Sequence, residues 1–273
     1  MARCEIRQAP GTDPMPDTPV NNRLVLLAIE TSDPVVYALA LSQCGDHGYN
    51  MAVGPCQGLS WEHWANIDPD NAVPWLAIAA KAGNSGDRQR VEEALAKASM
   101  ASHFDTYSST VSAIALGALP RDIAPLDQAV AGADVISVLG FSVTGVDIAA
   151  TLCSDIAVQA PTRRLQCTSI ANELADSGTT LLDLAAALNL ARRLGFPKDR
   201  QAELQNEQRN GARALVTHNP WTFTNDGTGF SSVSNFHCDT VLGYDEFIDA
   251  LQATGANERA ALAAVATAVQ RIR

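Results

Sequence analysis

The sequence predicts an all-α protein, and three observations support this prediction. Hydrophobic residues make up 47% of the 273 residues, but aromatic residues make up only 5%. The apolar content therefore consists mainly of Ala, Leu and Val, and the first two are strong helix formers. Several segments place apolar residues at helical spacing, such as Leu181, Leu184 and Leu188. Finally, two pairs of cysteines each bracket a short polar loop, an arrangement that suits helical hairpins stapled across their turns.

Local signals place the expected elements along the chain. Residues 1–20 are rich in proline and predict a flexible leader, which is followed by one helical-repeat domain at 21–273. Pro34 suits the first position of a helix, and Gly195 followed by Pro197 ends another. The expected helices span residues 23–30, 34–44, 60–66, 106–117, 124–138, 146–152, 168–175, 181–194, 198–215, 245–253 and 258–272, with two more in 68–98.

Residues 217–237 break the helical pattern. This stretch is rich in Gly, Ser and Asn and carries scattered aromatic residues, including Trp221, Phe223 and Phe230. Such a composition marks turns rather than a continuous element. It predicts a loop or a small hairpin.

The cysteines predict two local disulfides. The chain contains Cys4, Cys44, Cys56, Cys153, Cys167 and Cys238, which allow several complete pairings. We expect Cys44 to pair with Cys56 and Cys153 with Cys167, because a hairpin brings its two helix ends together. Closing a loop of this size stabilises by about 3 kcal/mol. Neither pair has the Cys-x-x-Cys spacing of common zinc sites, and inert reduced cysteines are the main alternative. The remaining two cysteines either pair with each other or stay free.

Disulfides also predict a compartment. They persist in the periplasm or outside the cell, so we expect a periplasmic or secreted protein. Residues 1–7 lack the apolar core of an export signal. Either a signal has been removed, or the protein is cytoplasmic and its cysteines are reduced. No apolar run is long enough for a transmembrane segment, and none is predicted.

The charge balance narrows the class of partner. The formal net charge is -11 and the isoelectric point is near 4.8. Binding to the nucleic-acid backbone requires clustered Lys and Arg, so no nucleic-acid partner is predicted. Adhesion to anionic membranes is disfavoured for the same reason. The charge suits a soluble protein, or one that meets a basic partner through electrostatic complementarity.

Residues 68–98 carry the clearest family pattern. The matching features are the Asp-Pro-x-Asn lead-in at 68–71, Trp75, Ile78, Ala79, the Gly86–Asp87 turn and Ala98. The segment resembles a tetratricopeptide repeat, a helix–turn–helix unit of about 34 residues. Val91 departs from the pattern, which prefers alanine there. More loosely, the layout is similar to Ala-rich helical-repeat proteins of the bacterial envelope. The resemblance implies a superhelix of stacked antiparallel hairpins, since one hairpin cannot bury its own apolar face.

No catalytic residue, metal ligand or cofactor site is predicted. Gly140-Phe-Ser142-Val-Thr-Gly145 misses the Gly-x-Ser-x-Gly spacing of a nucleophile elbow by one residue. His237, Cys238 and Asp239 are adjacent, so their side chains point in different directions. The histidines form no His-x-x-x-His pair, and no Gly-rich loop suits a phosphate. Asp68 and Asp70 could pair as carboxylates, but we expect them to shape the turn before the repeat.

The predicted function is therefore a non-enzymatic module that binds another protein or peptide. Trp61, Trp64 and Trp75 are the possible binding residues, because aromatic anchors dominate binding energy when they are exposed. A tryptophan-rich core between hairpins is the alternative. Two other functions stay open. One is an immunity or inhibitor protein that neutralises a toxic enzyme; the other is a hydrolase with a site in 217–239, joining His218 or His237 to Cys238 or a serine.

Overall fold

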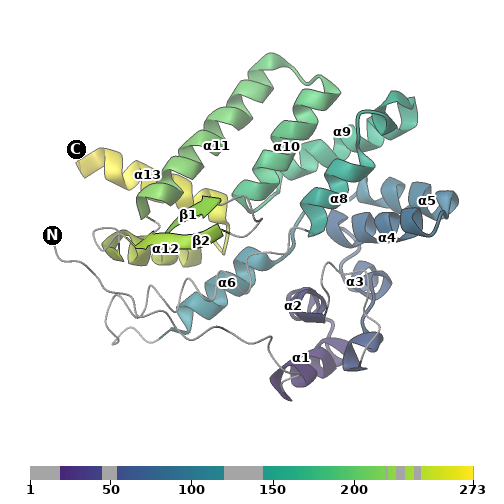
Figure 1. The fold of residues 1–273 in the computed structure, drawn as a ribbon, viewed down its shortest axis with the longest axis horizontal. Coiled ribbons are helices and arrows are strands. Elements are labelled where there is room, and N and C mark those ends of the chain that lie inside the picture. The colour runs from purple at the N-terminus through teal and green to yellow at the C-terminus, as the bar shows by residue number, and fades with distance from the viewer. Residues whose placement is uncertain are drawn as a thin grey trace.

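The computed structural model describes residues 19–44, 54–119, 144–218, 221–225, 231–236 and 241–272. These residues are helical apart from one pair of short strands, which confirms the predicted all-α class (Figure 1). The elements are α1 (Pro19–Glu30), α2 (Pro34–Cys44), η1 (Gly54–Gly58), α3 (Trp61–Ile67), α4 (Ala72–Asn84), α5 (Arg88–Ala98), α6 (Ser108–Gly117), α8 (Thr144–Leu152), η2 (Ala157–Gln159), α9 (Pro161–Asp176), α10 (Leu181–Leu194), α11 (Lys198–His218), β1 (Trp221–Asn225), β2 (Ser231–Phe236), α12 (Val241–Ala253) and α13 (Glu258–Ile272). The helix expected at 124–138 and most of the expected leader lie outside the described residues.

Strands β1 and β2 form a two-stranded antiparallel sheet. The register pairs Trp221 with Phe236 and Asn225 with Ser231, with an irregularity between Thr222 and Phe223. The small hairpin suggested for residues 217–237 is thus present. Among the described helices, none is both long and apolar enough to cross a membrane.

The segment with the repeat pattern folds as a helical hairpin, α4–α5. The Asn71 side chain caps α4 by accepting a hydrogen bond from the Val73 amide, and Asp87 caps α5 through the Arg90 amide. Gly86 lies between them with a φ of +76°, a left-handed conformation that glycine adopts without steric cost. The predicted hairpin is therefore observed, and local residues explain where each of its two helices begins and how the chain turns between them.

A second pair of helices lies on this hairpin. Helix α8 packs against α4, and α9 contacts α5 and packs closely against α10 (Figure 1). An ion pair between Glu92 and Arg163 links α5 to α9. Helices α10 and α11 continue the series, and α11 packs in turn on α13. Helices that neighbour one another in the described chain therefore bury apolar side chains against each other.

Two clusters of buried side chains hold the helices. The larger one joins α1 to α5 with α8 to α10, and it contains Tyr37, Phe104 and Leu174. The smaller one joins α6, α11, α12 and α13 around Leu116 and Leu262. Helix α6 follows the first hairpin in sequence but packs against α12. Residues distant in the chain thus build the second core.

Both predicted cysteine pairs lie at disulfide distance. The S–S distance is 1.88 Å for Cys44–Cys56 and 2.04 Å for Cys153–Cys167. The first pair joins the end of α2 to η1, and the second joins the turn after α8 to α9. Arg193 of α10 reinforces the second junction by donating from Nη1 to the Cys153 carbonyl oxygen at 2.7 Å.

One boundary near the second pair was predicted wrongly. The helix expected to start after Cys167 begins at Pro161, so Cys167 lies inside α9 and is fully buried. Pro161 occupies the first turn, where its missing N–H has no helical partner and its fixed φ suits the helix. The disulfide therefore staples the middle of α9 to the end of α8, not one helix end to another.

Candidate functional site

Two of the three predicted binding tryptophans lie in the core. Trp61 and Trp64 are only 5% and 3% exposed, and their ring centroids stack 5.6 Å apart. Tyr107 extends the stack, with its ring centroid 6.4 Å from that of Trp64. Trp61 and Trp64 therefore do not line an open groove; they fill the space between α3 and the segment before α6.

Trp75 lies differently, at the surface of the α4–α5 hairpin. It is partly buried, and its Nε1 donates a hydrogen bond to the Pro69 carbonyl oxygen at 2.9 Å. The Lys97 Nζ lies 4.1 Å from the centroid of the indole ring, a cation–π contact. Three residues after Lys97, just past the end of α5, Met100 is 74% exposed. Of the three predicted binding residues, Trp75 is the one that reaches the surface.

A partly buried polar cluster, formed by Asp68, Asn71, His103, Asp105 and Tyr107, lies where the hairpin meets the segment leading to α6. Asn71 is fully buried, and its side chain makes four hydrogen bonds. The Nδ2 donates to Asp68 Oδ2 at 2.8 Å and to the Asp105 carbonyl oxygen at 2.7 Å. The Oδ1 accepts from the amides of Val73 at 3.1 Å and Asp105 at 3.2 Å. Asn71 therefore uses its full hydrogen-bonding capacity to join α4 to this segment.

The other members of the Asp68 cluster surround the same carboxylate. The Tyr107 hydroxyl donates to Asp68 Oδ2 at 2.9 Å, and His103 Nε2 lies 3.3 Å from Asp68 Oδ1. Burial and the neighbouring Asp68 raise the pKa of Tyr107. Burial also raises the pKa of Asp105 to about 6, although the Tyr107 amide donates to its Oδ1 at 2.7 Å.

The Asp68 cluster holds the local backbone in place. Tyr107 has a φ of +59°, which is uncommon for a residue other than glycine, and the hydrogen bonds to its amide and hydroxyl hold it there. The Asp70 carbonyl oxygen accepts hydrogen bonds from the amides of Ser102 and His103, and the Asp68 carbonyl oxygen accepts one from the Asn71 amide. That the two carboxylates shape the turn stays a prediction. The hollow beside Tyr107 has a volume of about 10 Å³, room for a single water at most.

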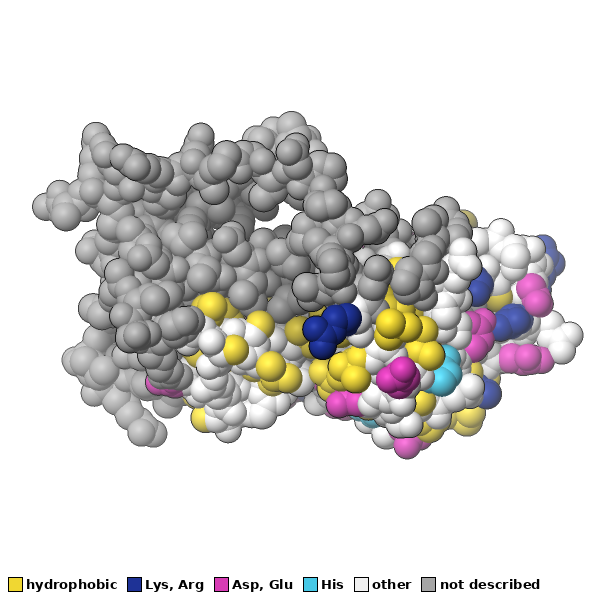
Figure 2. All heavy atoms as spheres, turned by 90° about the horizontal axis from the view of Figure 1, so that it is seen from below, with side chains coloured by type: hydrophobic (Ala, Val, Ile, Leu, Met, Phe, Trp, Pro, Cys, Tyr) yellow, Lys and Arg dark blue, Asp and Glu magenta, His cyan; other side chains and the backbone are white. Residues whose placement is uncertain are grey.

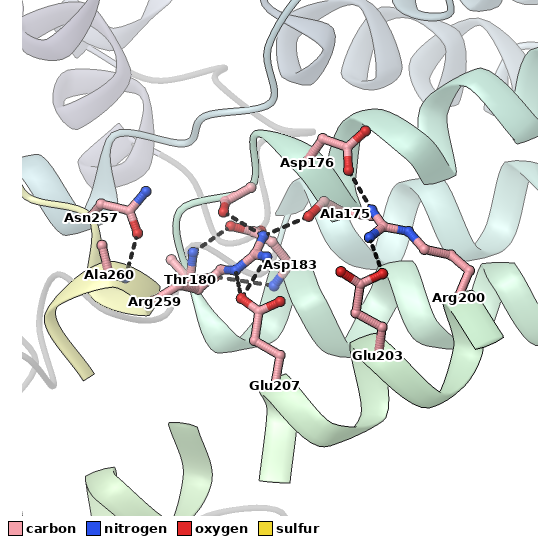
Figure 3. A network of polar contacts seen from close by, with 11 residues as sticks. Ala175, Asp176, Thr180, Asp183, Arg200, Glu203, Glu207, Asn257, Arg259 and Ala260 are labelled. Atoms are coloured by element: carbon pink, nitrogen blue, oxygen red, sulfur yellow. Dashed lines mark hydrogen bonds and ion pairs between the residues drawn. The ribbon is translucent and has the colours of Figure 1, made fainter. Parts of the chain in front are cut away.

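A second polar cluster, formed by Thr180, Asp183, Glu207, Glu258 and Arg259, lies where α9, α10, α11 and α13 meet. Figure 3 labels Thr180, Asp183, Glu207 and Arg259 of this cluster. The Arg259 Nη1 donates to the carbonyl oxygens of Ala175 and Gly178, at 2.9 Å each. Its Nε and Nη2 reach Glu207 Oε1 at 2.8 and 2.7 Å. Arg259 therefore caps the end of α9 and ties it to α11.

Two carboxyl groups of the Arg259 cluster have pKa values above their ordinary range. Asp183 forms a capping box with Thr180 and is buried, and this burial raises its pKa. Burial, together with the nearby Asp183, raises the pKa of Glu258 to about 7. We attribute both shifts to the packing of α13 onto the turn between α9 and α10.

The remaining sequence candidates are placed only in part. Ser142, His237 and Cys238 lie outside the described residues, as does Cys4, and His218 is described only as the last residue of α11. Within the described ranges, no group of three or more His, Cys, Asp or Glu side chains is arranged to hold a metal ion.

The two polar clusters could be predicted from the sequence only in part. The Asp-Pro-x-Asn lead-in at 68–71 contains Asp68 and Asn71, two members of the Asp68 cluster. Nothing local identified Tyr107 or Arg259, because their partners lie 39 and up to 84 residues away in the chain. No family model matches the chain, and neither a curated protein nor a solved structure matches it.

Proposed function

We propose that this chain is a non-enzymatic helical-repeat protein that binds another protein or peptide in the periplasm or the secreted space. Two cysteine pairs at disulfide distance support a compartment outside the reducing cytosol. The stacking of α8 on α4 and of α9 on α5 supports a tetratricopeptide-like arrangement of hairpins. The two polar clusters support the absence of catalysis, since their side chains are engaged in capping helices and joining segments.

The observation that carries the proposal is the surface around Trp75. The Lys97 ammonium lies over the Trp75 indole ring, and Met100, three residues after Lys97, is 74% exposed at the end of the hairpin where α4 begins and α5 ends. Tryptophan and methionine are enriched in protein interfaces, and a tryptophan that is already held in place loses little entropy on binding. We assign the Trp75 surface, defined as Trp75, Lys97 and Met100, as the binding site.

The partner is expected to be basic overall. The net charge of -11 favours association with a positively charged protein by long-range attraction. This charge also favours a second candidate function, an immunity or inhibitor protein that occludes a basic toxic enzyme. The two functions differ in what the partner does once it is bound.

Site-specific cross-linking tests the proposal. A photoreactive amino acid at Met100 should capture one partner from periplasmic extract or culture medium, whereas the same group at Gln89, exposed at the opposite end of α5, should not. The purified partner should then bind the Trp75→Leu and Met100→Asp variants at least about tenfold more weakly than wild type. Unchanged affinity would exclude the Trp75 surface. A covalent change in the mass of the partner would show that the protein is an enzyme, and loss of the partner's own activity would favour the inhibitor.

A further inference from the structure

Helix α1 presents an exposed face that the rest of the described chain leaves uncovered. Its opposite face is packed on α2 and η1 through Val25 and Ala28, both buried. Leu26 and Leu27 are 53% and 52% exposed, although leucine is normally buried. Figure 1 places α1 at one edge of the molecule, and Figure 2 views that side, where apolar side chains gather on the described part of the surface.

The exposed face also carries two charges, one at each end. Arg23 precedes the leucines by three residues and Glu30 follows them by three, and both are exposed. Neither forms an ion pair with another described residue. Positions 23, 26, 27 and 30 follow the i, i+3, i+4, i+7 spacing, so the four side chains form one stripe along the helix. Arg23 and Glu30 are about 10 Å apart along the axis at 1.5 Å per residue.

This stripe is self-complementary under a two-fold axis. If a second α1 lies antiparallel across it, with the axis between Leu26 and Leu27, Leu26 of each copy faces Leu27 of the other. The same axis brings Arg23 of each copy opposite Glu30 of the other. Isologous contacts require this kind of pattern, in which a patch is complementary to itself. A parallel arrangement of the two helices would instead set like charges side by side.

We propose that the α1 stripe, defined as Arg23, Leu26, Leu27 and Glu30, is the contact surface of a homodimer in which two copies of α1 pair antiparallel. Four leucine side chains form the apolar centre, and two Arg23–Glu30 ion pairs flank it. Each copy contributes four side chains to the contact, against about 20–30 residues a side in a standard protein interface, so the dimer is expected to be weak. The flanking ion pairs set the orientation of the two copies.

Charge exchange tests this geometry. Sedimentation of the oxidised wild type over a range of concentrations should show a monomer–dimer equilibrium that weakens as salt is added. Arg23→Glu alone, or Glu30→Arg alone, places like charges at both ends of the contact and should weaken dimerisation at least about tenfold. The double variant Arg23→Glu/Glu30→Arg restores both ion pairs with their signs reversed and should dimerise like wild type. An equimolar mixture of the two single variants should form heterodimers.

A control variant shows whether weaker dimerisation comes from the α1 stripe or from the change in net charge alone. Arg88→Glu changes the net charge by the same amount at the exposed start of α5 and should leave dimerisation unchanged. Helical circular dichroism should be the same for all variants, because the substituted side chains are exposed. A wild type that stays monomeric at millimolar concentration would overturn the proposal and leave the stripe to a different partner. Single variants that dimerise normally, or a double variant that does not recover, would equally overturn the antiparallel pairing.

Discussion

Asn71 is expected to be one of the most sensitive positions for stability. Replacing Asn71 with alanine removes four hydrogen bonds at a fully buried site. Loss of the cap of α4 costs about 1 kcal/mol. The two bonds to the Asp105 backbone contribute about 1 kcal/mol each, and the bond to the Asp68 carboxylate about 1.5–3 kcal/mol. Because water that enters the space recovers part of this, we expect Asn71→Ala to lower the free energy of unfolding by about 3–5 kcal/mol.

Urea denaturation of the oxidised protein measures this loss, with the slope of the transition checked for a common unfolded state. Asn66 is a suitable control, because it is exposed in α3, and Asn66→Ala should change stability by less than about 0.5 kcal/mol. Asn71→Asp keeps the oxygen that caps α4 but sets a second carboxylate against Asp68. It should destabilise strongly at pH 7 and recover in part at about pH 5. A loss below about 1.5 kcal/mol for Asn71→Ala would show that Asn71 does not join the two segments.

Three other predictions concern the buried charges and the core. Burial raises the pKa of Asp105 from 3.8 to about 6 and that of Glu258 from 4.5 to about 7, so the folded protein binds protons that the unfolded chain releases. The free energy of unfolding should therefore fall as the pH rises from about 4 to about 7. Asp105→Asn should make this pH dependence less steep. A wild-type stability that rises over the same range would contradict the raised pKa values. Arg259→Ala should lower the free energy of unfolding by about 2–4 kcal/mol, measured from denaturation midpoints, because it removes the hydrogen bonds that cap the end of α9. The more exposed ion pairs of Arg200 should contribute at most about 1 kcal/mol. Equal losses on replacing Arg259 and Arg200 would mean that the Arg259 cluster stabilises the fold no more than a surface ion pair does. Among the described residues, the buried Trp64 Nε1 has no hydrogen-bond partner. Trp64→Phe should therefore cost only about 1–2 kcal/mol of stability, against about 3–5 kcal/mol for Trp64→Ala. Similar losses for the two variants would show that this indole N–H is satisfied.

The helices could be predicted because their signals are local. Capping residues such as Asn71 and Asp87, and the turn at Gly86, lie within a few residues of the elements they delimit. The cysteine pairs were predictable for the same reason, since each closes a short stretch of chain. The start of α9 was missed although Pro161 marked it, because the cysteine loop was assumed to end at Cys167.

The candidate site was less accessible to sequence reasoning. The pattern identified three tryptophans but not which of them would be covered, since burial of Trp61 and Trp64 depends on Tyr107, whose ring comes from a segment more than forty residues away. Positive φ at a tyrosine is rare and is imposed by tertiary contacts. Arg259 likewise finds its side-chain partners on α9, on the turn after it and on α11. Such contacts are fixed by packing, and no local pattern specifies them.

A disulfide map of the protein isolated from its native cell without reductant tests the account of a stapled helical module outside the cytosol most directly. Mass spectrometry of an unreduced digest should show Cys44 linked to Cys56 and Cys153 linked to Cys167. Reduction of each bridge should lower the free energy of unfolding by about 2–5 kcal/mol. Free thiols at all four positions, or cross-pairing between the two units, would contradict both the staples and the oxidising compartment.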